Sequence, residues 1–259
     1  MSERDKDVIV FRYDKSKNYY LVSLHLENKP GALGNLANVL GIRDINILEG
    51  FFGGMSYGEN AVVSFFLEST NKRMDHKWLK DFLQTVVYVS DVEVKEAVEG
   101  ILTDTLNFPL TWNNGDRAVL MRTEGLRTML EAIKSSDSST GEAAIYSQGF
   151  SYGKAAWENL MSNVRPSTKE GLQEILGVYS AVGWGKPELI DLDAGKRRAK
   201  LRMIDNFECE GAATGSSASN FVRGHISGAF STYFGGYVRV VEKKCKSKGD
   251  SYCEFEVSP

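Results

Sequence analysis

The sequence has few of the features that mark secreted, membrane or nucleic-acid-binding proteins. It contains three cysteines in 259 residues, and so small an odd number argues against a disulfide framework. No run approaches the ~18 apolar residues of a membrane span, and the charged N-terminal residues lead into no apolar segment of signal-peptide length. We therefore expect a cytoplasmic protein without membrane contact. The net charge of −3 gives no general attraction to DNA or RNA, so direct nucleic-acid binding is not expected.

Motifs of several common chemistries are also missing. The three histidines, His25, His76 and His225, are too few for a histidine-rich metal site. The sequence has no Walker loop and no Gly-x-Gly-x-x-Gly, so phosphate-driven chemistry has no support. The composition, 42% hydrophobic and 25% charged, is that of an ordinary globular protein, and the length favours two domains.

The most informative segment lies near the C-terminus. Residues 236–257 have the pattern of two strands joined by a tight Gly-Asp turn at 249–250. Such a hairpin brings Cys245 and Cys253 towards each other, with Glu242 one strand pitch away. One carboxylate and two thiolates suit Zn²⁺, which accepts both oxygen and sulfur ligands. Two alternatives stay open: inert thiols that fill space, and a reversible disulfide that senses redox state.

A helix is predicted immediately before this hairpin. Within residues 219–234, apolar side chains recur at helical spacing, and Gly235 with Gly236 ends the pattern. The order of helix, glycine break, glutamate, cysteine, Gly-Asp turn and cysteine resembles the C-terminal signature of the 4-vinyl reductase domain. That ligand-sensing fold is shared with phenol-sensing bacterial activators and is related to a Golgi-transport adaptor family. The resemblance covers residues 117–259.

This resemblance implies a metal site and a ligand pocket. In the phenol sensors, a glutamate and three cysteines hold zinc; the glutamate corresponds to Glu242, and two of the cysteines to Cys245 and Cys253. The third falls on Ser219, so Cys209 is the tentative replacement. Zinc is the one cofactor expected. The resemblance also implies a small apolar or aromatic ligand, with candidate pocket walls at Trp157, Phe207, Phe230 and Tyr233.

The N-terminal third has a different pattern. Residues 18–27 alternate as a strand, and Leu33, Leu36 and Leu40 follow at helical spacing up to Gly41. Later segments predict a strand at 61–67, a helix with Trp78, Leu79, Phe82, Leu83 and Val86, and a strand at 87–94. The resulting βαββαβ order is the ferredoxin-like arrangement.

The segment after the first predicted strand carries a second resemblance. Residues 28–33, followed by 44–47 (Asp-Ile-Asn-Ile), resemble an ACT domain over residues 17–99. These regulatory modules pair side by side and bind amino acids between subunits. The resemblance implies a homodimer and a ligand loop of Asn28, Lys29, Pro30, Gly31, Ala32 and Leu33. Gly31 permits close backbone approach, and the first amides of the helix attract a carboxylate. An ACT domain used only for dimerisation is the alternative.

One motif in the C-terminal part favours an enzyme instead. Gly149-Phe-Ser151-Tyr-Gly153 matches the nucleophile elbow Gly-x-Ser-x-Gly, between a strand expected at 143–147 and a helix expected at 149–164. Asp193 or Asp205, then His225, would complete a triad. An α/β-hydrolase, however, needs several parallel strands before its elbow. Here only one further short strand is expected at 118–121, and a loop at 135–141.

Together these patterns predict an α+β protein. Its parts are an extension at 1–16, a ferredoxin-like ACT module at 17–99, a connector at 100–116 and a mixed α+β module of the 4-vinyl reductase type at 117–259. We expect a non-catalytic ligand sensor with no catalytic residue. It would bind an amino acid or similar small molecule in the first module and an apolar or aromatic molecule in the second. Its output would pass through a downstream protein partner. The alternatives are a Ser151 hydrolase, a tetrapyrrole-reductase accessory and a cysteine redox sensor.

Overall fold

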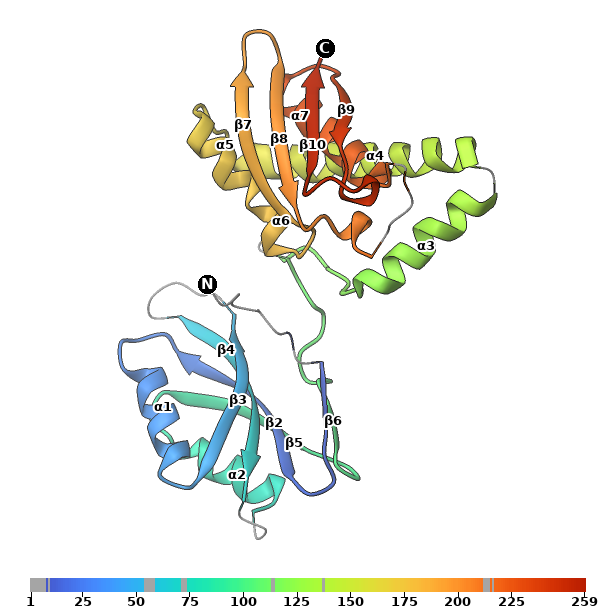
Figure 1. Ribbon diagram of the computed structural model, residues 1–259. Coiled ribbons are helices and arrows are strands. Elements are labelled where there is room, and N and C mark those ends of the chain that lie inside the picture. Colours follow the sequence, from blue (N-terminus) through green and yellow to red (C-terminus); the bar gives the residue numbers. More distant parts are fainter. Residues whose placement is uncertain are drawn as a thin grey trace. The chain divides into compact units, whose positions relative to one another are not determined.

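The computed structural model describes residues 8, 10–53, 59–70, 74–112, 115–136, 138–211, 215 and 217–259. The chain divides into two compact units, Met1–Val119 and Leu120–Pro259. Each unit combines helices with antiparallel sheets (Figure 1), which confirms the predicted α+β class.

The first unit has the predicted βαββαβ order. Its four-stranded sheet has the order β3-β4-β2-β5, with every neighbouring pair antiparallel. The elements are β2 (Asn18–Glu27), α1 (Ala32–Gly41), β3 (Ile45–Phe52), β4 (Asn60–Ser69), α2 (His76–Gln84) and β5 (Val89–Glu96). This is the ferredoxin-like arrangement.

Alternation along β2 explains how the sheet is covered on both faces. Tyr20, Val22 and Leu24 are buried in one cluster with Leu36 of α1 and Leu79 of α2. The alternate residues of β2 belong to a second, smaller cluster of Tyr19, Leu21, Phe66 and Leu102. A strand that buries both faces is specified tightly, because a shift of one residue would exchange the two clusters.

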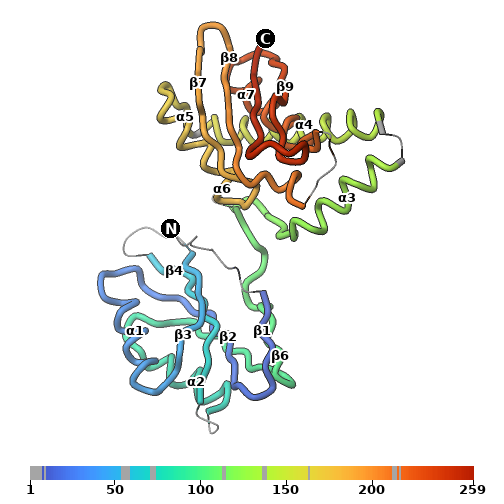
Figure 2. Tube along the Cα trace, viewed as in Figure 1, coloured from blue at the N-terminus to red at the C-terminus, as the bar shows by residue number. Residues whose placement is uncertain are grey.

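Two segments predicted as extension and connector contribute a further small sheet. β1 (Phe11–Tyr13) pairs antiparallel with β6 (Ile101–Thr103), and the two run side by side in Figure 2. Leu102 of β6 is fully buried. Part of the expected connector therefore belongs to the core of the first unit.

The second unit places helices against another antiparallel sheet, of order β7-β8-β10-β9. The predicted hairpin is present as β9 and β10, with Gly249 in the left-handed region at φ 104°. The elements are α3 (Thr123–Ser136), α4 (Ser138–Asn163), α5 (Lys169–Leu176), α6 (Val178–Ala181), β7 (Lys186–Asp193), β8 (Arg198–Ile204), the 3₁₀ turn η1 (Phe207–Cys209), α7 (Asn220–Phe234), β9 (Arg239–Lys244), the 3₁₀ turn η2 (Lys246–Lys248) and β10 (Cys253–Ser258).

Three expectations for this unit were wrong. Residues 118–121 form no strand, residues 143–147 lie inside α4, and most of the expected loop at 135–141 belongs to the ends of α3 and α4. Serine and glycine at 135–141 are weak helix formers and suggested a loop, and the apolar residues at 118–121 and 143–146 suggested short strands. For the two segments that join helices, the local preference was misleading. Packing against a neighbouring helix overrides that local preference.

The contact between α4 and α7 depends on four glycines. A Cβ added at Gly149 would lie 2.2 Å from the carbonyl oxygen of Phe221, and one at Gly153 would lie 2.2 Å from that of His225. The reverse contacts are equally close: 2.1 Å from Gly224 to the Tyr146 oxygen and 2.2 Å from Gly228 to the Phe150 oxygen. The glycines, four residues apart on each helix, let the two backbones touch.

This packing shows that residues 149–153 do not form the nucleophile elbow of a hydrolase. Ser151 lies in the middle of α4, not on a strained turn after a strand, and its side chain is exposed. His225 is buried on α7, where its Nδ1 lies 2.7 Å from the Tyr179 hydroxyl. The two glycines of the motif therefore serve helix packing.

None of the helices in the described part of the chain combines the length and the hydropathy that a membrane span requires.

Candidate functional sites

The first candidate site is a cluster of thiols and a carboxylate in the second unit. Cys209 ends the turn η1, Glu242 lies on β9, Cys245 follows β9, and Cys253 begins β10. The ligand atoms of these four residues all lie within 4.8 Å of one another. The structure thus brings together the four side chains that the sequence predicted as metal ligands.

The sulfur spacing fits a metal better than a disulfide. Cys209 Sγ lies 3.5 Å from Cys245 Sγ and 3.6 Å from Cys253 Sγ. A sulfur–sulfur bond is about 2.05 Å long, whereas the corners of a tetrahedron with arms of about 2.3 Å are about 3.8 Å apart. The three cysteines are free and buried. Three thiolates and one carboxylate form a donor set that suits Zn²⁺.

Burial and mutual hydrogen bonding disturb the protonation of the cluster. Burial raises the pKa of Glu242 to about 7. Hydrogen bonds with the other two sulfurs lower the pKa of the Cys245 thiol and raise that of Cys209. So many acidic groups cannot all ionise together without a cation. A divalent metal ion would displace the shared protons, so metal affinity would depend on pH.

Two further residues of this site were not predicted as site residues: Asn206 gave no signal in the sequence, and Ser219 was marked only as the position of the family's third cysteine. Asn206, just before η1, and Ser219, just before α7, are buried beside the cysteines. Neither residue type is a usual zinc ligand, so the fold was needed to show that both side chains lie beside the thiols.

The predicted aromatic pocket walls separate into two groups. Trp157 and Phe230 have ring centroids 6.0 Å apart, and Tyr233 lies 6.1 Å from Phe230. Phe207 belongs instead to a group with Trp184, 5.6 Å away. Trp157, Phe207 and Phe230 are all buried in the core of the second unit.

The second candidate site is a pocket of about 300 Å³ in the first unit. Asn28 and Lys29 come from the loop after β2, and Ala32 and Leu33 from the start of α1. All four were predicted as ligand residues; Pro30 and Gly31 complete the loop without lining the pocket. Gly31 has φ 86°, a left-handed conformation that glycine adopts without strain.

The other lining residues were not predicted. They are Leu26, Glu27, Phe52, Gly53, Ala61 and Val63. Antiparallel pairing places the end of β2, the start of β4 and the end of β3 at one end of the sheet. These lining residues could have been predicted from the ferredoxin-like order, because that order determines which strand ends lie next to one another.

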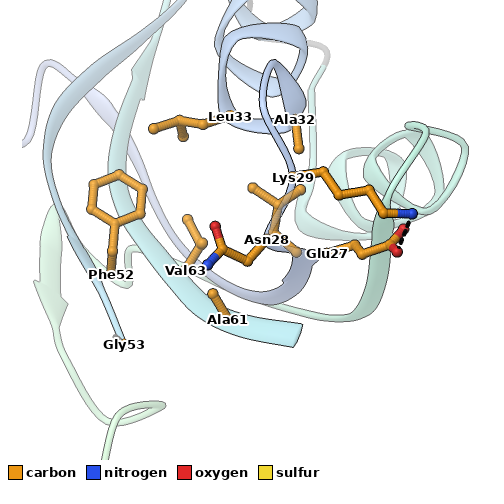
Figure 3. Close-up of a pocket in the computed structure, with 10 residues that line it drawn as sticks. Glu27, Asn28, Lys29, Ala32, Leu33, Phe52, Gly53, Ala61 and Val63 are labelled. Carbon is orange, nitrogen blue, oxygen red and sulfur yellow. Dashed lines mark ion pairs between the residues drawn. The ribbon is translucent and has the colours of Figure 1, made fainter. Parts of the chain in front are cut away.

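The pocket has an apolar wall and a polar edge (Figure 3). Leu33, Phe52 and Val63 surround the open space, and the Asn28 carboxamide points into it. The Lys29 ammonium pairs with the Glu27 carboxylate at the edge. Because that pair balances its own charge and Asn28 is neutral, the lining as a whole carries no net charge.

Comparisons with known proteins bear mainly on the second unit. A family model described as the V4R domain matches residues 200–259, which contain all four residues of the cluster. No curated protein sequence matches the chain.

Among solved structures, the phenol-responsive sensory domain of the transcription activator PoxR, solved with phenol, is 17% identical, with a TM-score of 0.50 over 57% of this chain and 79% of that one. A vinyl-4-reductase family protein from Methanocaldococcus jannaschii is 22% identical over 56% of this chain and 84% of that one, with a TM-score of 0.37. Trafficking protein particle complex subunit 3 from Naegleria fowleri, covalently bound to palmitic acid, is 16% identical over 52% and 93%, with a TM-score of 0.41. The C-terminal part of the chain thus carries a V4R domain, and the PoxR comparison supports its fold.

Proposed function

We propose that this protein is a non-catalytic, ligand-sensing regulator whose first unit binds a small amphiphilic molecule, such as an amino acid. The pocket beside the Asn28–Leu33 loop is the observation that carries the proposal, because a cavity lies where the ACT-like pattern predicts a ligand. The V4R domain supports a sensing role, since the structurally similar PoxR domain is described as phenol-responsive. A fold by itself does not establish catalysis, because the same fold supports unrelated functions in different proteins.

The lining defines the class of ligand. Leu33, Phe52 and Val63 favour an apolar side chain, while the Asn28 carboxamide offers both a donor and an acceptor. Because the lining carries no net charge, we expect the preferred ligand to carry no net charge. A zwitterionic amino acid with an apolar side chain satisfies these conditions.

Calorimetric titration of the purified chain with individual amino acids tests this proposal. We expect neutral apolar amino acids to bind, and aspartate and lysine to bind much more weakly or not at all. Leu33→Glu places a charge on the apolar wall and should abolish binding. Ile42→Glu is the matched control, because Ile42 is exposed and does not line the pocket.

Absence of heat for every amino acid, or equal binding by Leu33→Glu and wild type, would contradict the amino-acid proposal. Aryl esterase activity that is present in wild type and disappears in Ser151→Ala would contradict the proposal that the protein is non-catalytic. A tetrapyrrole-reductase accessory is the remaining enzyme alternative.

In the second unit, we propose that Cys209, Glu242, Cys245 and Cys253 hold zinc. The ion would join the turn after β8 to the β9–β10 hairpin, and such a link contributes directly to folding stability. A small apolar or aromatic ligand of this unit, as the resemblance implies, is a separate proposal. Trp157, Phe230 and Tyr233 are its candidate contacts, since their rings lie together.

A further inference from the structure

Two neutral polar side chains are buried among the four metal-binding candidates. Asn206 and Ser219 are each 1% exposed. Asn206 precedes η1, and its Oδ1 accepts a hydrogen bond from the Glu208 amide at 3.2 Å. Ser219 precedes α7 but makes no side-chain capping bond to that helix. Its hydroxyl is directed to the cluster instead.

The direction of the hydrogen bonds follows from the chemistry of the donors. Because Oδ1 of Asn206 accepts from a backbone amide, the other end of its carboxamide is the NH₂ group. Nδ2 donates to Ser219 Oγ at 2.8 Å. The single proton of Ser219 is therefore left for Glu242, whose Oε1 lies 2.7 Å away. The result is a chain of two hydrogen bonds, from the Asn206 amide to the Ser219 hydroxyl and from that hydroxyl to the Glu242 carboxylate.

The same two side chains contact the sulfurs. Ser219 Oγ lies 3.1 Å from Cys209 Sγ, and Asn206 Nδ2 lies 3.7 Å from the Sγ atoms of Cys209 and Cys253. Because the Ser219 proton goes to Glu242, the donor left for the sulfurs is the second N–H of Asn206. A donor near a thiolate reduces its effective charge and eases the crowding of several thiolates around one cation. A buried hydroxyl that bonds to the carboxylate also restricts how that carboxylate can turn.

We infer that Asn206 and Ser219 are positioning residues for a divalent thiophilic cation such as Zn²⁺. Ser219 holds the Glu242 carboxylate through Oε1, and Asn206 orients the Ser219 hydroxyl and donates to the sulfur of Cys209. The inference rests on the proposed metal site and extends it to residues that do not themselves bind the ion. Loss of such outer partners typically weakens metal binding 10- to 100-fold.

The test measures zinc affinity of the purified full chain by competition with a chromophoric chelator. We expect Ser219→Ala to bind zinc roughly 10- to 100-fold more weakly than wild type, and Ser219→Thr, which keeps the hydroxyl, to bind more tightly than Ser219→Ala. Asn206→Asp keeps the acceptor for the Glu208 amide but removes the donor, so it should also weaken binding. Ser227→Ala is the control, because Ser227 is equally buried but bonds to the Val238 carbonyl.

Substitution with Co²⁺ separates positioning from direct ligation. The thiolate-to-cobalt absorption of Ser219→Ala should keep the intensity of three thiolates, because no sulfur is removed. Wild type that binds zinc no more tightly than Ser219→Ala would overturn the inference while leaving the metal site intact. If wild type binds no zinc, both the metal site and the positioning role of Asn206 and Ser219 are overturned. The amino-acid titration tests a different site, in the first unit, and its outcome is independent of these results.

Discussion

At the scale of single residues, the position of the third thiol, at 209 and not at 219, is the most specific feature of the cluster of thiols and carboxylate. The family pattern expects a cysteine where Ser219 stands, yet the third thiol reaches the same cluster from Cys209. The two side chains lie 3.1 Å apart at Sγ and Oγ. A thiol at either position therefore lies beside Glu242, Cys245 and Cys253.

This proximity predicts the outcome of a swap. Cys209→Ser should lose zinc, and the double change Cys209→Ser with Ser219→Cys should recover most of it, because three thiolates and one carboxylate are again present. The zinc content of each variant is measured by elemental analysis after dialysis. Cys245→Ser is the control, because we expect no substitution at position 219 to restore its zinc. Full zinc content in Cys209→Ser alone would show that Cys209 is not a ligand.

His225 gives a second prediction at this scale. Burial lowers its pKa to about 3, below the ~6.5 of an exposed histidine. Between these values the unfolded chain binds a proton that the folded chain does not, so stability falls as pH decreases through this window. The slope from one group is at most about 1.4 kcal/mol per pH unit. Above about pH 6.5 the contribution is fully present.

Denaturant unfolding between pH 4 and 8 checks this expectation in wild type and in His225→Asn, whose amide can still bond to Tyr179. The variant should lose part of the pH dependence between about pH 4 and 6.5. Parallel curves for the two proteins across that window would mean that His225 titrates normally in the folded chain.

At the scale of elements, the glycines between α4 and α7 determine how the second unit packs. Gly153→Ala and Gly224→Ala each put a Cβ about 2 Å from a carbonyl oxygen, and backbone cannot move aside as a side chain can. Alanine favours helix by up to ~1 kcal/mol, but overpacking costs typically 1–3 kcal/mol or more. We expect a net loss of stability in both variants.

Gly125→Ala in α3 is the matched control, because a Cβ there meets nothing within 4 Å. Its free energy of unfolding should stay equal or rise slightly. If Gly153→Ala and Gly224→Ala were as stable as Gly125→Ala, the close contact of the two helices would be refuted.

At the scale of the whole molecule, the edge strand β3 of the first sheet favours self-association. β3 is an edge strand, and Phe51 and Phe52 on it are exposed. Edge strands are usually covered, and symmetric pairing of two copies does this. We predict a homodimer of twice 28.8 kDa, to be measured by light scattering at micromolar concentration.

Phe51→Lys should shift the dimer towards monomer, because it places a charge on the edge. Ile42→Lys, also exposed but outside the strand, should not. A wild-type mass of 28.8 kDa would rule out the pairing. We further propose that the output of this protein passes through a downstream protein partner.

The sequence by itself determined the elements whose pattern is local. Strand β2, helix α1 and the β9–β10 hairpin follow from alternation, helical spacing and a Gly-Asp turn, because each pattern is written within a few neighbouring residues. The loop of Asn28 to Leu33 and the pair Cys245 and Cys253 were found for the same reason.

Only the tertiary structure decided the features that depend on distant segments. The first part of α4 was predicted as loop and strand from its own residues, whereas the packing of α4 against α7, some 70 residues away in sequence, outweighs that local preference. Phe52 and Val63 enter the pocket because antiparallel pairing joins strand ends. Ser219 and Asn206 join the cluster of thiols and carboxylate because burial leaves their donors no partner in water, and they donate instead to a carboxylate and to sulfur.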